Sequence, residues 1–164
     1  MCFSQTRLVV NDYFFNITII EQRENHLNLN FVGEAVSFMQ KKRILVADDS
    51  VVIVEMLQFI FSQNSEADVV VAEDGVKALE FIQKEKFDLV ICDIDMPKKS
   101  GILFGFEVRS LKVETPIIYF TSFNDTQINR AQRVLDDTTF YVGEKDVDKL
   151  LKLVKKILNI DLTK

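Results

Sequence analysis

The chain has 164 residues, of which 48% are hydrophobic and 27% are charged, a composition typical of a soluble globular domain with a sizeable core. Its formal net charge of -5 argues against nucleic-acid binding as the main function. Two cysteines, Cys2 and Cys92, are too few to predict a disulfide framework or a zinc site, and no apolar run approaches the ~20 residues of a membrane-spanning helix. We therefore expect a cytoplasmic protein that binds neither nucleic acid nor a membrane.

Residues 1–38 differ in pattern from the rest of the chain. Strand-forming residues gather at 7–10, 13–21 and 27–32, so this stretch is either a small β-hairpin or a disordered extension. Met39 precedes a natural start for a domain. We therefore divide the chain into an N-terminal extension, 1–38, and one domain, 39–164.

From residue 43 onward, short apolar runs alternate with longer segments of helical periodicity. The apolar runs predict five strands, at about 43–47, 67–72, 89–92, 116–120 and 139–142. The periodic segments predict five helices, at about 51–63, 76–85, 102–111, 124–135 and from Asp146 or Asp148 to 158. Ser50 is the expected N-cap of the first helix. This alternation predicts a doubly wound α/β fold, in which a parallel sheet of flavodoxin-like order 2-1-3-4-5 carries helices on both faces.

Polar side chains stand at the carboxyl ends of four of the predicted strands. Asp48 and Asp49 follow the first strand, Asp93 the third, Thr121 the fourth and Lys145 the fifth. Taken singly, each has a simpler interpretation, as a helix cap, a turn acid, a strand residue or a surface lysine. In an open parallel sheet, however, ligands bind outside the carboxyl ends of the strands, so the joint pattern indicates one site.

In order and spacing these residues resemble the receiver domain of two-component response regulators. Met96-Pro97 and Gly101, which follow Asp93, belong to the same pattern. The resemblance extends from about Lys41 to the C-terminus and does not cover the N-terminal extension. It implies that Asp93 is a phosphoacceptor.

The chemistry that the resemblance implies suits these residue types. A carboxylate with a reference pKa of about 4 is ionised at neutral pH and can attack a phosphoryl group to form an acyl phosphate. Mg2+ prefers a few carboxylates together with water and phosphate oxygens. The resemblance assigns the ion to Asp48, Asp49, Asp93 and the backbone carbonyl of Asp95. The Thr121 hydroxyl and the Lys145 ammonium would hold the phosphoryl oxygens.

The fifth strand departs from the family pattern. The family's lysine is usually followed by proline, whereas Lys145 is followed by Asp146. An alignment keyed on Tyr141 places Glu144 at the phosphate. One keyed on chemistry places Lys145 there, which requires either one extra residue in the preceding loop or a bulge around Gly143. We favour Lys145, because Glu144 would bring a further carboxylate to an anionic product.

The resemblance implies a single-domain response regulator, and no enzyme beyond catalysis of its own phosphorylation and dephosphorylation. The phosphoryl donor would be a histidine kinase or a histidine phosphotransfer protein. The protein would be a monomer or weak dimer. Once phosphorylated, it would signal to a downstream target protein through a changed surface. Two alternatives stay open: a pseudo-receiver binding module that does not use phosphorylation, and a small phospho-aspartate phosphohydrolase, which Asp95 two residues after Asp93 suggests.

Overall fold

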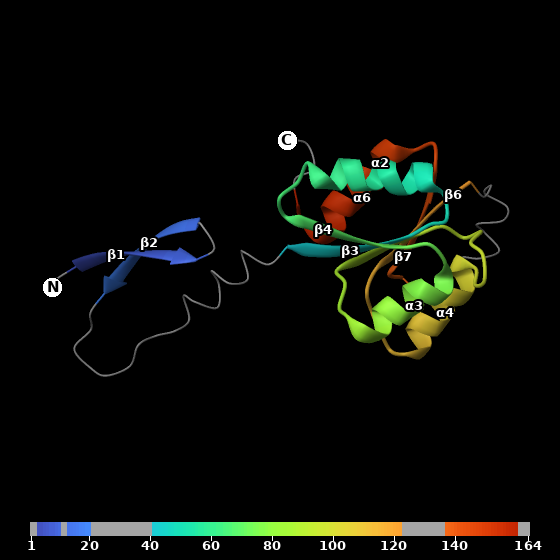
Figure 1. Cartoon of the computed structure of the whole chain (residues 1–164), viewed down its shortest axis with the longest axis horizontal. Helices are drawn as coiled ribbons and strands as arrows, with labels where there is room; N and C mark the ends of the chain where they lie inside the picture. Colours follow the sequence, from blue (N-terminus) through green and yellow to red (C-terminus); the bar gives the residue numbers. More distant parts are fainter. Residues whose placement is uncertain (1–2, 11–12, 21–40, 123–136, 161–164) are drawn as a thin grey trace. The chain divides into compact units, whose positions relative to one another are not determined.

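The structure is a computed structural model that describes residues 3–10, 13–20, 41–122 and 137–160. The chain divides into two compact units, Met1–Phe38 and Met39–Lys164. In the first unit, β1 (Phe3–Val10) and β2 (Tyr13–Ile20) form an antiparallel pair (Figure 1). The helix predicted at 124–135 lies outside the described residues.

The second unit is built on a parallel sheet of five strands. They are β3 (Lys42–Ala47), β4 (Ala67–Ala72), β5 (Leu89–Cys92), β6 (Ile117–Thr121) and β7 (Thr139–Gly143). The spatial order β4-β3-β5-β6-β7 is the predicted order 2-1-3-4-5, counted within this unit. All four residues of β5 are buried, as expected for a central parallel strand that is covered on both faces.

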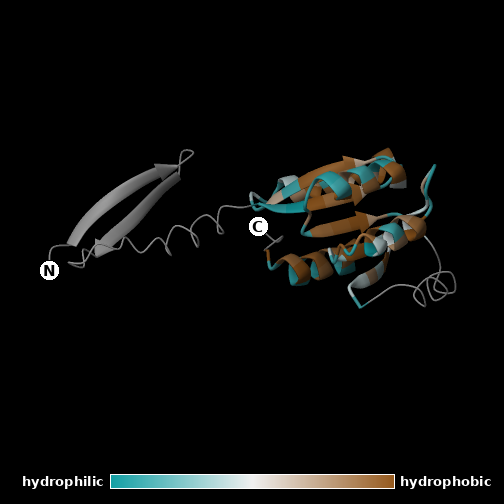
Figure 2. Ribbon diagram, turned by 90° about the horizontal axis from the view of Figure 1, so that it is seen from below, coloured by the Kyte–Doolittle hydropathy of each residue, from teal (hydrophilic) through white to brown (hydrophobic). Residues whose placement is uncertain are grey.

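Helices cover both faces of this sheet, as predicted. The described helices are α2 (Val51–Ser62), α3 (Gly75–Lys84), α4 (Gly101–Ser110) and α6 (Val147–Leu158). Helices α2 and α6 lie on one face, and α3 and α4 lie on the other (Figure 1). Most of the sheet between them is hydrophobic (Figure 2). In the described ranges, no helix is long and apolar enough to cross a bilayer.

Alternation along the strands builds a core on each face. In β3, Ile44 and Val46 pack with Leu57 of α2, whereas the intervening Leu45 packs with Phe104 of α4. Successive strand side chains point to opposite faces of the sheet, and both faces are covered by helices. The covered part of such a strand must therefore be a run of apolar residues, whereas alternation of apolar and polar residues would suit a strand with one face in water.

The helix starts differ in detail from the sequence predictions. Ser50 precedes α2, but its side chain makes no capping hydrogen bond. Its N–H instead donates to Oδ1 of Asp48 at 2.8 Å. For α6 the structure selects Asp146 as the N-cap, because its carboxylate accepts from the N–H of Lys149 at 3.1 Å.

Candidate functional site

The carboxyl ends of neighbouring strands bring the predicted residues to one edge of the sheet. Ala47 and Cys92, which end β3 and β5, are partners in the register, and the Asp93 N–H donates to the carbonyl of Ala47 at 2.8 Å. Thr121 and Gly143, which end β6 and β7, are likewise partners. Residues that follow these strand ends therefore meet at the same edge.

Asp93 has the environment expected of a reactive carboxylate. Its exposed fraction is 8%, and Oδ2 accepts from the N–H of Asp95 at 3.1 Å. Its other oxygen, Oδ1, is buried and has no hydrogen-bond partner among the described residues. A buried carboxylate oxygen without a partner costs free energy, so this position favours a ligand that satisfies it.

Asp48 is the second buried acid, with an exposed fraction of 5%. Its pKa is raised to about 7, mainly by burial, while the hydrogen bond from the Ser50 N–H acts to lower it. Neighbouring carboxylates contribute to the rise, and these are Asp93, Glu144 and Asp49. The side chain of Asp49 is exposed. Several negative charges around a buried acid make a position suited to a cation.

At the fifth strand the structure bears on one of the two geometries expected for Lys145, the bulge around Gly143. Strand β7 pairs residue by residue with β6 up to Thr121 and Gly143, and Gly143 does not have a positive φ. The bulge that would bring Lys145 to the phosphate is therefore absent from this described strand. Glu144 follows the strand directly, and its N–H donates to the Thr121 carbonyl at 3.1 Å.

Glu144, which we did not favour for this position, lies beside the acids. Its pKa is raised by burial and, next, by the negative charge of Asp93, while a hydrogen bond from the Ser122 N–H acts to lower it. Lys145 is exposed and forms no ion pair within the described part of the chain. The sequence did indicate the position of Glu144, because an alignment with the family pattern keyed on Tyr141 places Glu144 at this edge.

The two remaining predicted residues also lie at this edge. Thr121 is fully buried at the end of β6. The side chain of Asp95 is exposed, but its N–H contacts the carboxylate of Asp93. The backbone of Asp95 is thus beside the candidate acceptor, as the predicted carbonyl ligand requires.

The donor set suits magnesium. Among the described residues, no three His, Cys, Asp or Glu side chains are arranged to hold a metal ion by themselves. Mg2+ does not need such a cage, because it is usually held by one or two carboxylates with water and phosphate oxygens. A cation would satisfy Oδ1 of Asp93 and offset the charge around Asp48. The residues that would hold it are Asp48, Asp49, Asp93 and the Asp95 carbonyl.

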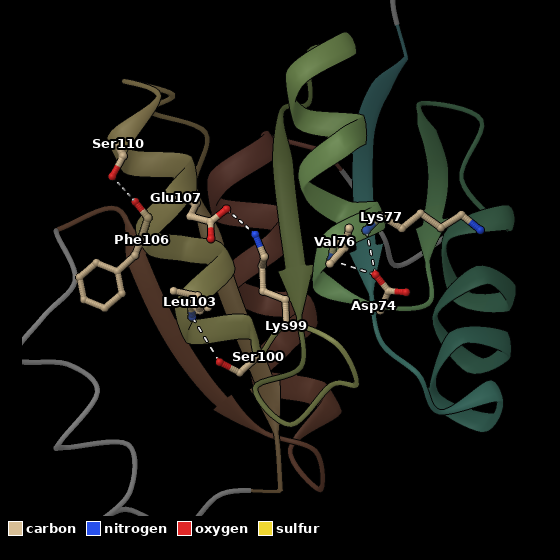
Figure 3. Close-up of polar contacts among 9 residues, drawn as sticks. All are labelled: Asp74, Val76, Lys77, Lys99, Ser100, Leu103, Phe106, Glu107 and Ser110. Atoms are coloured by element: carbon tan, nitrogen blue, oxygen red, sulfur yellow. Dashed lines mark hydrogen bonds and ion pairs between the residues drawn. The ribbon is translucent and has the colours of Figure 1, made fainter.

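The loop after Asp93 is attached to α3 through Asp74, which the sequence analysis did not single out. One oxygen of Asp74 caps α3 by accepting from the N–H groups of Val76 and Lys77, at 2.9 and 2.8 Å (Figure 3). The other forms an ion pair with Lys98 in the loop. The available signal was an Asp-Gly pair directly before a helical apolar pattern, which is typical of an N-cap.

The same loop is also attached to α4 and β6. Lys99 forms an ion pair with Glu107 of α4 (Figure 3). The buried Tyr119 hydroxyl donates to the Gly101 carbonyl at 2.9 Å, and its ring stacks on Tyr141 with 5.1 Å between centroids. Burial raises the pKa of Tyr141 to about 12, so its inward-facing hydroxyl stays neutral. The loop after Asp93, called the acceptor loop below, is therefore held by contacts with α3, α4 and β6.

We expect Asp74→Ala to lower the free energy of unfolding by about 1–2 kcal/mol, the usual cost of losing an N-cap. Asp74→Asn is the matched variant, since Asn retains the cap acceptor and removes the charge that pairs with Lys98. The Lys98 ammonium and the capping N–H groups lower the pKa of Asp74. The charge therefore stabilises the fold above the ordinary Asp pKa, and this contribution is lost as pH falls through the lowered pKa. Urea unfolding at several pH values should show the wild type and Asp74→Asn converging in acid; a constant difference would contradict this account.

The comparisons with known proteins agree with this geometry. The profile of the response regulator receiver domain matches residues 44–157. The chain therefore belongs to the response regulator receiver family, and its site is the acidic edge of a receiver domain.

Curated relatives include regulators of different lengths. The alkaline phosphatase synthesis transcriptional regulatory protein PhoP of Bacillus subtilis is 40% identical over 81 residues, covering 49% of this chain and 33% of PhoP. The transcriptional regulatory protein DltR of Streptococcus agalactiae is 33% identical over 115 residues, covering 69% of this chain and 50% of DltR. Sporulation initiation phosphotransferase F of Bacillus subtilis is 26% identical over 120 residues, covering 73% of this chain and 96% of the relative. The chain thus spans a third to a half of the two transcriptional regulators.

Solved structures show the same fold. Response regulator TrrA from Thermotoga maritima, solved in complex with Mg2+-BeF, is 34% identical with a TM-score of 0.61. The match covers 71% of this chain and 98% of TrrA. A receiver domain from Francisella is 26% identical with a TM-score of 0.65, and the match covers 73% of this chain and 98% of that domain.

Proposed function

We propose that this receiver accepts a phosphoryl group on Asp93 in a reaction that requires Mg2+. The donor is a histidine kinase or a histidine phosphotransfer protein, and a downstream protein reads the surface that phosphorylation changes. Because the match to this chain covers 96% of the length of sporulation initiation phosphotransferase F, we propose a single-domain regulator of similar organisation. The protein acts on no external substrate other than its phosphoryl donor.

The observation that carries this proposal is the environment of Asp93. It is buried at the tip of the central strand β5, has one oxygen without a partner among the described residues, and lies near Asp48. A carboxylate oxygen forms a bond to phosphorus while the bond from phosphorus to the donor atom breaks. When bound, Mg2+ offsets the charge that gathers as phosphate approaches the acids. The Mg2+-BeF complex of TrrA supports a magnesium ion at this edge.

Neighbouring residues position the acceptor. The Asp95 N–H holds Oδ2 of Asp93 at 3.1 Å, and the Asp93 N–H is held by the Ala47 carbonyl at 2.8 Å. The buried Thr121 would supply a hydroxyl to the phosphoryl oxygens. Preset hydrogen bonds of this kind reduce the reorganisation that phosphoryl transfer requires.

Intact-mass analysis tests the proposed function. Incubation of the full chain with a small acyl phosphate and Mg2+ should add the mass of one phosphoryl group. The same incubation with a chelator in place of Mg2+ should add none. Failure to gain mass with Mg2+, or an equal gain without a divalent cation, would refute the proposal.

One observation favours a second function, a receiver-fold binding module that does not use phosphorylation. The Glu144 carboxylate lies near Asp93 and opposes an incoming phosphate by charge repulsion. The intact-mass experiment separates the two functions, since a module of this kind gains no phosphoryl group under any of the conditions.

A further inference from the structure

The tip of β7 presents a negative charge to the acceptor site. Strand register fixes this arrangement, because β7 pairs with β6 without a bulge and the Glu144 N–H donates to the Thr121 carbonyl at 3.1 Å. The side chain is partly buried, and the Ser122 N–H hydrogen-bonds to its carboxylate. These contacts hold Glu144 at the edge where Asp48 and Asp93 meet.

A second observation indicates that this edge is set up for a positive ligand. The side chain of Asp93 is more than nine-tenths buried, and its Oδ1 has no partner in the described residues. Both Asp93 and Glu144 act electrostatically on the buried Asp48. No described cation pairs with any of these three carboxylates. Within the part of the chain that the structure describes, no cation offsets their mutual repulsion, and a bound cation would do so.

We propose that Glu144 is a specificity-determining residue that biases this receiver toward its cation-bound, unphosphorylated form. The inference rests on the proposed function and extends it to the balance between the two ligands of the site. Glu144 acts through its charge and need not coordinate the ion. A divalent cation gains attraction from each nearby carboxylate, whereas a phosphoryl group, which carries about -1.5 to -2 charges, is opposed by it. The site thus binds Mg2+ readily, but it becomes phosphorylated only when the concentration of the phosphoryl donor is high.

The experiment compares the wild type with Glu144→Gln, Glu144→Lys and Asp148→Asn. The last removes one negative charge from the exposed first turn of α6 and serves as the matched control. Isothermal titration with Mg2+ alone measures cation affinity in the unphosphorylated protein. Intact mass at saturating Mg2+ and a fixed acyl phosphate concentration measures the phosphorylated fraction.

Glu144→Gln should weaken Mg2+ binding by about fivefold, and Glu144→Lys should weaken it further, because each step removes attraction for the cation. The phosphorylated fraction should rise in the same order, and Asp148→Asn should match the wild type in both measurements. Equal Mg2+ affinity in the wild type and Glu144→Gln would overturn the inference, as would a lower phosphorylated fraction in Glu144→Lys. Absence of phosphoryl uptake in every form would refute the proposed function, while the cation affinities would still decide the role of Glu144.

Discussion

Replacing Asp93 by Asn is expected to abolish phosphoryl uptake from an acyl phosphate in the presence of Mg2+. The amide cannot serve as the attacking carboxylate, whereas its oxygen can still accept the Asp95 N–H that holds Oδ2 at 3.1 Å. The variant should also remain folded, because a buried negative charge near Asp48 is removed. Intact mass measures uptake, and circular dichroism checks the fold.

The matched control for this variant is Asp95→Asn. Asp95 is two residues further along the loop, and its exposed side chain leaves its backbone N–H and carbonyl available in either form. We expect this variant to take up one phosphoryl group. Equal labelling of the wild type and Asp93→Asn would mean that another residue is the acceptor.

Gly101→Ala should destabilise the protein by about 3 kcal/mol, the upper end of the range for overpacked sites. A Cβ at this position would collide with the carbonyl oxygen of Asp93 and lie 2.9 Å from Sγ of Cys92. Backbone atoms of the acceptor residue cannot move aside as a flexible side chain can. The same collision would displace Asp93, so phosphoryl uptake should fall together with stability.

Gly143→Ala is the control for this substitution. Among the described residues other than its two chain neighbours, no atom lies within 4 Å of a Cβ at Gly143, and the φ of Gly143 is not positive. Alanine there should change the free energy of unfolding by less than about 1 kcal/mol, in the stabilising direction, because it reduces the freedom of the unfolded chain. Denaturant unfolding of both variants measures the difference. A Gly101→Ala protein as stable as Gly143→Ala would show that α4 does not pack against the acceptor loop in this way.

The sheet order and the polar strand ends were predictable from the sequence. Central parallel strands are covered on both faces, so they must be short apolar runs. The first polar residue after such a run shows where the strand ends. In β5 the run ends at Cys92, and the next residue, Asp93, is placed at the edge by chain geometry alone. Local pattern therefore determined where the acids would meet.

Contacts between distant segments were not predictable in this way. The choice between Glu144 and Lys145 depends on how β7 pairs with β6, and a shift of one residue exchanges them. The ion pair between Asp74 and Lys98 joins two segments that are distant in the sequence. The contact of Gly101 with Asp93 depends on how the chain turns between β5 and α4. Chemical preference favours Lys145 for the phosphate, whereas the pairing of β7 with β6 brings the Glu144 N–H to the Thr121 carbonyl.

Peptide mapping of the labelled wild-type protein tests the central claim most directly. The chain is treated with acyl phosphate and Mg2+, cleaved at low temperature, and fragmented to locate the added phosphoryl group. We predict a single modified residue, Asp93, at the tip of β5. A phosphoryl group on any other residue, or an unmodified Asp93 in protein that has gained the phosphoryl mass, would contradict the assignment of this site.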